Sequence, residues 1–147
     1  MAGTGPEEES LKRLAVELGI SEHVKFLGQI AERALFYRTL DRFALTSLHE
    51  GLPIVLLEAM ASGIPVISTD LEGSRYVLEE GIHGIIVPSN HVSAMAEAFL
   101  KVPFQHQIMT ARTRVEADFS AINAAEKVTR LYEKLFFDSL DVSTKPI

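Results

Sequence analysis

The sequence predicts an α/β protein with a Rossmann-like, doubly wound parallel sheet. Short apolar runs rich in β-branched residues alternate along the chain with segments whose apolar residues recur at helical spacing. No internal repeat or low-complexity segment interrupts this alternation. The chain has 147 residues, of which 47% are hydrophobic, so it can bury the core of one domain.

The composition excludes several classes of function. The 14 basic and 20 acidic residues give a net charge of -6, which does not support a nucleic-acid partner. The absence of cysteine excludes disulfide bonds and thiol chemistry. Because neither a signal peptide nor an apolar run of membrane-spanning length is present, we expect a cytoplasmic protein; peripheral attachment of a larger parent protein to a membrane stays open.

The first third of the chain predicts a loop, a helix and a strand. Residues Gly3–Pro6 form the loop, and the three glutamates at 7–9 place acidic side chains in the first helical turn. The helix ends at Gly19, and its apolar stripe is Leu11, Leu14, Ala15 and Leu18. Val24–Gly28 is a β-rich run that predicts a parallel strand, although Gly28 could equally be a simple turn glycine.

The segment after this strand predicts a helix and then a strand. Apolar and charged residues alternate at helical spacing over Ala31–Leu40. Asp41–Ser47 is the strand, and it leads directly into a loop that carries Glu50. His49 precedes that acid, but one histidine without partners at ligand spacing does not predict a metal site.

The segment from Glu50 to Gly63 organises the rest of the chain. Pro53 is suited to the first position of a helix, and Gly63 followed by Pro65 ends it after two to three turns. The residues between are apolar on every side except for Glu58, which predicts a helix buried against the sheet with one carboxylate that needs hydrogen-bond donors.

The direction of helical side chains connects the two acids. Side chains lean toward the N-terminus of a helix, so we expect Glu58 to point at the loop that holds Glu50 and Gly51. The free amides of the first turn face the same mouth and attract phosphate or hydroxyl oxygens. Each acid taken alone could be a solvated loop residue or an ion-pair partner.

The remainder predicts two strands and a helical C-terminus. Pro65–Asp70 is a buried strand, Gly81–Pro88 is a turn followed by a strand, and three helices follow from Val92 onward. Pro103 restarts the second of these helices, and the third closes the domain over residues 120–138. We expect the apolar stripe of the third helix to lie in the core and residues 139–147 to form a frayed tail. That stripe is Ile122, Ala125, Val128, Leu131, Tyr132, Leu135 and Phe136.

Two segments closely resemble a known family signature. Ser47–Pro53 and Glu58–Ile67 are similar to the Glu-x7-Glu signature of the retaining family 4 glycosyltransferases, and the likeness extends from Gly3 to about Phe136. It implies the later part of the C-terminal, donor-binding domain of a GT-B enzyme. The departures are at 71–78, where Glu72 replaces a glycine and Arg75–Tyr76 replaces a Pro-Glu pair, which puts local sugar contacts in doubt.

The resemblance implies roles for individual residues. Glu50 would hold hydroxyls of the donor sugar, the backbone of Gly51, Leu52 and Pro53 would approach sugar and phosphate, and Glu58 would accept the ribose hydroxyls. The nucleobase would lie near Leu27, Gly28 and Gln29. The donor would be a UDP-sugar or GDP-sugar, with no cofactor and no metal.

The resemblance also implies what the chain does not supply. The family's first strand and helix of this domain, with an Arg and a Lys that neutralise the leaving diphosphate, have no counterpart here, nor has the N-terminal acceptor domain. Because stabilising the leaving-group charge is usually the largest catalytic contribution, we expect a single incomplete domain over 1–147 that is inactive alone. Its acceptor, a glycan, lipid or small molecule, would bind through the missing domain.

Two other functions remain open at this point. The first is a non-catalytic module that completes its sheet on a partner chain or in a homo-oligomer. The second, weaker alternative is a nucleotide-sugar epimerase or a phosphorylase of similar architecture, for which substrate contacts are not recognisable in the sequence.

Overall fold

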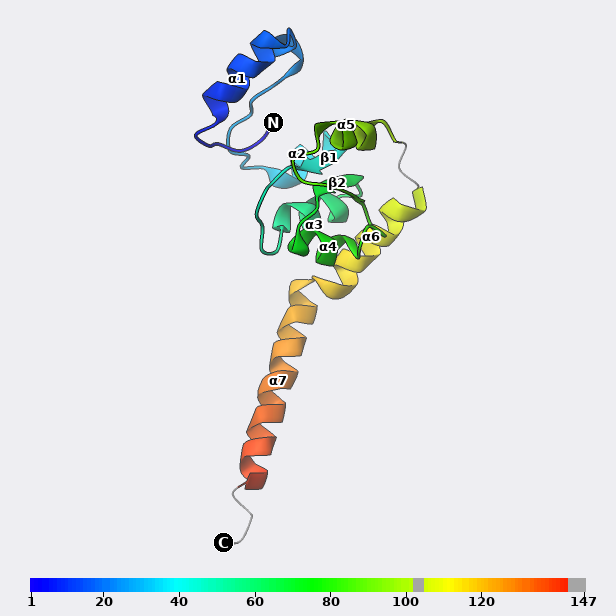
Figure 1. Cartoon of the computed structure of the whole chain (residues 1–147). Coiled ribbons are helices and arrows are strands. Elements are labelled where there is room, and N and C mark those ends of the chain that lie inside the picture. Colours follow the sequence, from blue (N-terminus) through cyan, green and yellow to red (C-terminus); the bar gives the residue numbers. More distant parts are fainter. Residues whose placement is uncertain (102–104, 143–147) are drawn as a thin grey trace. The chain divides into compact units, whose positions relative to one another are not determined.

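The computed structural model describes residues 1–101 and 105–142 and divides into two compact units, Met1–Thr39 and Leu40–Ile147, which we describe separately. Figure 1 shows the elements in chain order. The first unit contains the helices α1 (Glu8–Glu17) and α2 (Arg33–Arg38) and the short 3-10 helix η1 (Ser21–His23). The strands of the second unit are β1 (Phe43–Leu45), β2 (Val66–Thr69) and β3 (Ile85–Val87). Its helices are α3 (Ile54–Ala61), α4 (Glu72–Leu78), α5 (Val92–Leu100), α6 (Gln105–Asp118) and α7 (Ala121–Val142).

The first unit confirms the predicted helix but not the predicted strand. α1 ends where predicted, before Gly19, whose φ of +68° terminates the helix. The strand predicted at Val24–Gly28 is wrong: this backbone is hydrogen-bonded to the first three residues, as from the Leu27 amide to the Met1 carbonyl (2.9 Å), but it is no assigned strand. At the end of the run Gly28 turns the backbone out of the extended conformation, with a φ of +61°.

The second unit is built on a parallel sheet of order β1-β2-β3 among the described residues. Phe43 is in register with Val66, and Ile67 is in register with Ile85. The four residues of β2 are all buried, as expected for the central strand of a parallel sheet covered on both faces. These strands confirm the predictions for segments 41–47, 65–70 and 81–88.

Helices cover the two faces of this sheet. Ile67 and Val87 pack with Ala98 of α5 on one face. On the other face Ser68 bonds to Ser74 of α4, and α3 packs on β1 and β2 and also against α6. In Figure 1 α5 lies above the strands, and α3 and α4 lie below them. Helix α4 was not predicted, because Gly73 within it lowers helix propensity.

Three expectations for the C-terminal part need correction or qualification. Pro103 lies outside the described residues, so its role in restarting a helix is not described. The tail predicted from residue 139 is wrong up to Val142, because α7 continues to that residue, and residues 143–147 lie outside the described part. The apolar stripe of α7 is not in a core.

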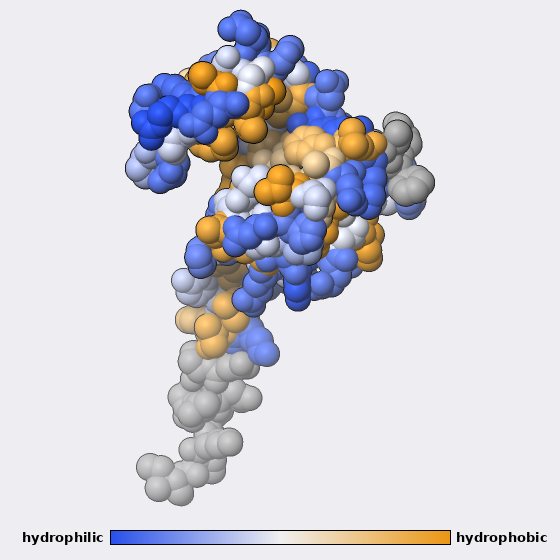
Figure 2. Space-filling view, turned by 45° about the horizontal axis from the view of Figure 1, so that its top comes forward, coloured by the Kyte–Doolittle hydropathy of each residue, from blue (hydrophilic) through white to orange (hydrophobic). Residues whose placement is uncertain are grey.

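The exposed fractions of its side chains show that the apolar stripe of α7 is not buried. Six large side chains of the stripe expose half of their surface or more: Ile122, Val128, Leu131, Tyr132, Leu135 and Phe136. Figure 2 shows apolar surface along the part of α7 that is drawn in colour. Helical periodicity predicted an apolar face correctly, but it cannot specify whether this chain supplies the surface that covers the face.

Among the described residues, no helix is both long enough and apolar enough to cross a membrane.

Candidate functional site

The carboxyl ends of the three strands meet at one edge of the sheet. In open α/β sheets ligands bind in the crevice outside this edge. β1 is followed there by residues 46–53, β2 by Asp70 and β3 by Pro88. The sequence-predicted residues Glu50–Pro53 therefore occupy the edge at which a ligand is expected.

Glu50 is exposed, and its carboxylate is held by a neighbour in the same loop. The Ser47 hydroxyl donates to Glu50 Oε1 at 2.8 Å. The loop is itself attached to β2, since the buried Thr69 hydroxyl donates to the Ser47 carbonyl at 2.6 Å. An ionised carboxylate only accepts hydrogen bonds and offers about four lone-pair sites, so Glu50 retains capacity for sugar hydroxyls.

The backbone after Glu50 forms the entrance to α3. Gly51 and Leu52 are exposed, whereas Pro53 is buried. Pro53 was predicted as the first residue of the helix, but α3 begins one residue later, at Ile54. The carbonyl of Gly51 packs so closely on Gly73 of α4 that a Cβ on Gly73 would lie 1.8 Å from the carbonyl oxygen. The first turn of α3 follows directly from this loop, and its Leu56 amide donates to the Pro53 carbonyl at 3.0 Å.

Glu58 is only partly buried, which corrects the expectation that it is a buried carboxylate in a helix buried against the sheet. Leu56 and Met60 are fully buried, whereas Ile54 and Val55 expose 52% and 36% of their surface. Glu58 lies one turn after Ile54, on this partly exposed side, and therefore keeps access to solvent. Its ribose-binding role, and a mouth shared with Glu50, stay predictions.

The nucleobase residues belong to the first unit. Gly28 has a φ of +61°, and its carbonyl accepts a hydrogen bond from the Gly3 amide at 2.7 Å. Leu27 exposes 46% of its surface. The positive φ explains the glycine by a backbone turn, and contact of Leu27, Gly28 and Gln29 with a base stays a prediction.

The sequence did not reveal an ion pair beside the loop. The Arg75 guanidinium donates from Nε to Asp70 Oδ1 (2.5 Å) and from Nη2 to Asp70 Oδ2 (2.7 Å). Both residues line an open hollow of about 580 Å³ after β2, together with Leu71, Glu72, Tyr76 and Glu80. The pair lies in the segment where the chain departs from the family pattern, and the spacing of five residues gave no usual helical signal for it.

This ion pair predicts a pH dependence. Hydrogen bonds from Arg75 hold the pKa of Asp70 below its usual value of 3.8, so the pair stabilises the fold fully above about pH 3.8 and loses that effect as the pH falls through the lowered pKa. Asp70→Asn should therefore flatten the acid decline in the free energy of unfolding, measured by urea titration between neutral pH and pH 2. The change should be small because both side chains are partly exposed. Identical acid profiles would contradict the assignment.

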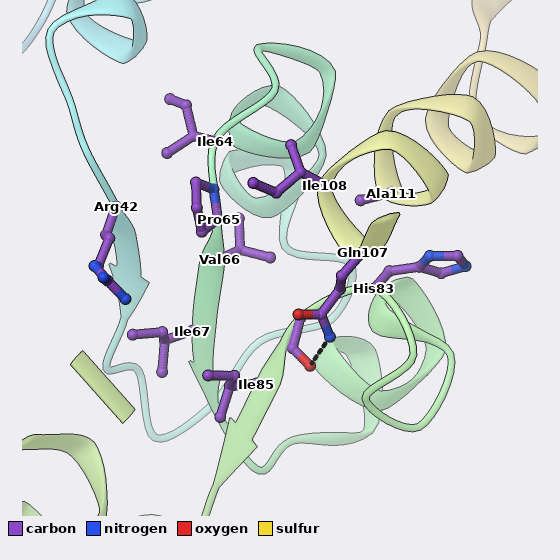
Figure 3. Close-up of a pocket in the computed structure, with 11 residues that line it drawn as sticks. Arg42, Ile64, Pro65, Val66, Ile67, His83, Ile85, Gln107, Ile108 and Ala111 are labelled. Atoms are coloured by element: carbon purple, nitrogen blue, oxygen red, sulfur yellow. Dashed lines mark hydrogen bonds between the residues drawn. The ribbon is translucent and has the colours of Figure 1, made fainter. Parts of the chain in front are cut away.

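Two further hollows differ in size and lining. One on the α5 face holds about 360 Å³ near the carboxyl edge, between Leu48, Pro88 and the α5 residues Met95 and Phe99. The other is at the opposite end of β2 and holds about 10 Å³. Figure 3 shows that its lining combines apolar side chains with the polar side chains of Arg42, His83 and Gln107, and the Gln107 amide donates to the Gly84 carbonyl at 3.4 Å. It has room for about one water molecule and none for a sugar nucleotide.

Sequence comparison connects the chain with glycosyltransferases. The family model described as "Glycosyl transferases group 1" matches residues 1–106. The lipopolysaccharide core biosynthesis glycosyltransferase LpsE of Rhizobium meliloti (strain 1021) is 33% identical over 110 residues, which cover 75% of this chain and 32% of LpsE. The D-inositol 3-phosphate glycosyltransferase of Corynebacterium jeikeium (strain K411) is 35% identical over 137 residues, 89% of this chain and 33% of the relative. The chain thus spans about a third of the length of these curated relatives.

Comparison with solved structures also finds glycosyltransferase-type folds. Sucrose-phosphate synthase from Thermosynechococcus elongatus superposes with a TM-score of 0.80 at 26% identity, over 92% of this chain and 37% of the synthase. Anabaena HepE, solved in complex with UDP, superposes with a TM-score of 0.81 at 22% identity, over 90% of this chain and 40% of HepE. These neighbours confirm the predicted fold class, an α/β layer of the GT-B type.

Proposed function

Because the chain belongs to the group 1 glycosyl transferases, we propose that the carboxyl edge of its sheet binds the nucleotide-diphosphate sugar of a hexosyl-transfer reaction. The observation that carries the proposal is the anchored Glu50 carboxylate directly before the N-terminus of α3. The carboxylate suits vicinal hydroxyls of a sugar, and the amides of a helix start suit a diphosphate. HepE, whose fold is similar, has also been solved with UDP-glucose, which supports this class of donor.

The finer features of the reaction follow the family resemblance. We propose retention of the anomeric configuration, as in family 4 enzymes, and a transfer step that needs no metal. Glu58 would accept the ribose hydroxyls, and the backbone of Gly51–Pro53 would approach the sugar and phosphates. This chain spans about a third of its relatives, so we assign it donor binding and propose that transfer needs an acceptor half.

Replacing Glu50 tests this proposal. Glu50→Gln keeps the side-chain shape but removes the charge, so the affinity for UDP-glucose or a GDP-sugar should fall about tenfold or more, the value of one charge-assisted hydrogen bond. Isothermal titration of both donors against the 147-residue chain measures it. The matched control is Glu97→Gln, the same change at an exposed position of α5, which should leave the affinity unchanged. A wild-type chain that binds neither donor would contradict the proposal.

A second candidate function is a module that pairs with a separate acceptor-domain chain, and two observations favour it. Within the described residues β1 is an edge strand whose neighbour is β2, and an unpaired strand edge can pair with another chain. The apolar face of α7 is also exposed over most of its length. Contiguous apolar surface of this kind marks protein interaction sites.

Without such a partner, the exposed face of α7 should make the chain self-associate. Light scattering after size-exclusion chromatography should show species larger than a monomer, and Leu131→Glu with Leu135→Glu should shift them to the monomer by placing charges on the apolar face. Lys127→Glu with Lys134→Glu, on the polar face, is the matched control and should not. A wild-type monomer that unfolds cooperatively would count against this candidate.

A further inference from the structure

We infer that Thr69 is a positioning residue whose hydroxyl fixes the loop that carries Glu50. This inference rests on the proposed donor site at the same edge. Thr69 is the last residue of β2 and exposes only 4% of its surface. Its hydroxyl donates to the Ser47 carbonyl at 2.6 Å, a short bond between the central strand and a loop 22 positions earlier in the chain.

The contact continues from Ser47 to the acid itself. Ser47 uses its carbonyl to accept from Thr69 and its hydroxyl to donate to Glu50 Oε1 at 2.8 Å. One residue therefore joins the rigid strand to the carboxylate. Since the hydroxyl occupies one lone-pair site of the carboxylate, it fixes the direction in which the remaining sites are presented to a ligand.

A second contact holds the loop on the other side of Glu50. The Gly51 carbonyl packs against Gly73 of α4, and α4 is joined to β2 by the buried hydrogen bond between the Ser68 and Ser74 hydroxyls (2.8 Å). Both attachments of the loop thus lead back to β2 and α4. Binding groups held on regular elements in this way are placed more precisely than groups on an unsupported loop.

The hydrogen bonds of the Thr69 hydroxyl contribute more to the position of the loop than to the stability of the whole domain. Thr69→Val keeps the volume of the side chain and removes the short hydrogen bond to Ser47 and a long one to the Leu45 carbonyl (3.5 Å), a small part of the stability of a domain. The bond to Ser47 is a large part of what restrains a short exposed loop, whose local order depends on few contacts. Thr69→Ser retains the hydroxyl and should retain the restraint.

Backbone order and donor affinity together test the inference. In the wild-type chain the 15N order parameters of the His49–Gly51 amides should be near 0.85, the value of a rigid backbone, and in Thr69→Val they should fall below about 0.6. The affinity for UDP-glucose should fall about three- to tenfold in Thr69→Val and recover in Thr69→Ser. The control is Thr39→Val, which removes another hydroxyl-to-carbonyl bond, to Phe36. It should change neither measurement.

The outcomes separate this inference from the proposed function. A loop that is already mobile in the wild type, or equally rigid in Thr69→Val, overturns the inference whether or not a donor binds. If the loop loosens but a bound donor keeps its full affinity, the positioning role is overturned. If the wild type binds neither UDP-glucose nor a GDP-sugar, the proposed function fails, while the order parameters still decide whether Thr69 fixes the loop.

Discussion

Gly73→Ala should destabilise the protein by about 3 kcal/mol and abolish measurable binding of the donor. The added Cβ would lie 1.8 Å from the Gly51 carbonyl oxygen and 3.0 Å from Pro53 Cδ, and neither atom is the end of a flexible side chain. Helix α4 or the Glu50–Pro53 loop must therefore move. In an ordinary helix the same change stabilises by about 1 kcal/mol, so the prediction reverses the sign that helix propensity alone gives.

Thermal unfolding and donor titration measure the two effects of Gly73→Ala. The melting temperature should fall by more than about 10 °C, because 1 kcal/mol corresponds to several degrees in a domain of this size. Gly5→Ala is the matched control, since a Cβ there meets nothing within 4 Å and its φ is not positive. Wild-type stability and affinity in Gly73→Ala would show that the loop and α4 are not in close contact.

Leu56→Ala is expected to cost about 3 kcal/mol of unfolding free energy. Leu56 is fully buried in α3, so its truncation removes apolar contacts and leaves a cavity that packed neighbours cannot fill. Urea unfolding should show a lower midpoint with an unchanged slope. This loss would loosen the helix that directly follows the Glu50 loop.

The matched control for Leu56→Ala is on the same helix. Ile54 exposes 52% of its surface, so Ile54→Ala should cost less than about 1 kcal/mol. Equal losses at the two positions would mean that α3 does not present the buried and exposed sides described here.

The sequence predicted α3 because its end signals are local. Pro53 and Gly63 act through their own backbone geometry, and α3 lies between them. The exposure of Glu58 could not be predicted in the same way. It depends on which side of α3 the sheet and α6 cover, and that side is selected by residues distant in the sequence.

Val24–Gly28 and α7 illustrate the same limit. A β-rich run becomes a strand only if a partner strand pairs with it regularly, and among the described residues the backbone bonds of this run go to Met1, Gly3 and Ser21. The spacing of apolar residues predicted the helix α7 correctly. Whether those residues are buried depends on a second surface that covers them, and they are exposed. The close approach of Gly73 to Gly51 leaves a weaker signal in the sequence, an isolated glycine within an otherwise helical segment.

The strand order of the second unit bears on how this protein acquires its structure. Each strand pairs with the next one along the chain, and only residues 46–65 and 70–84 separate the partners. Closing such short segments costs little chain entropy, and topologies dominated by nearby pairings fold faster than those that join distant segments. The pairing of these strands, and with it the edge that carries Glu50, should therefore not depend on contacts with the first unit.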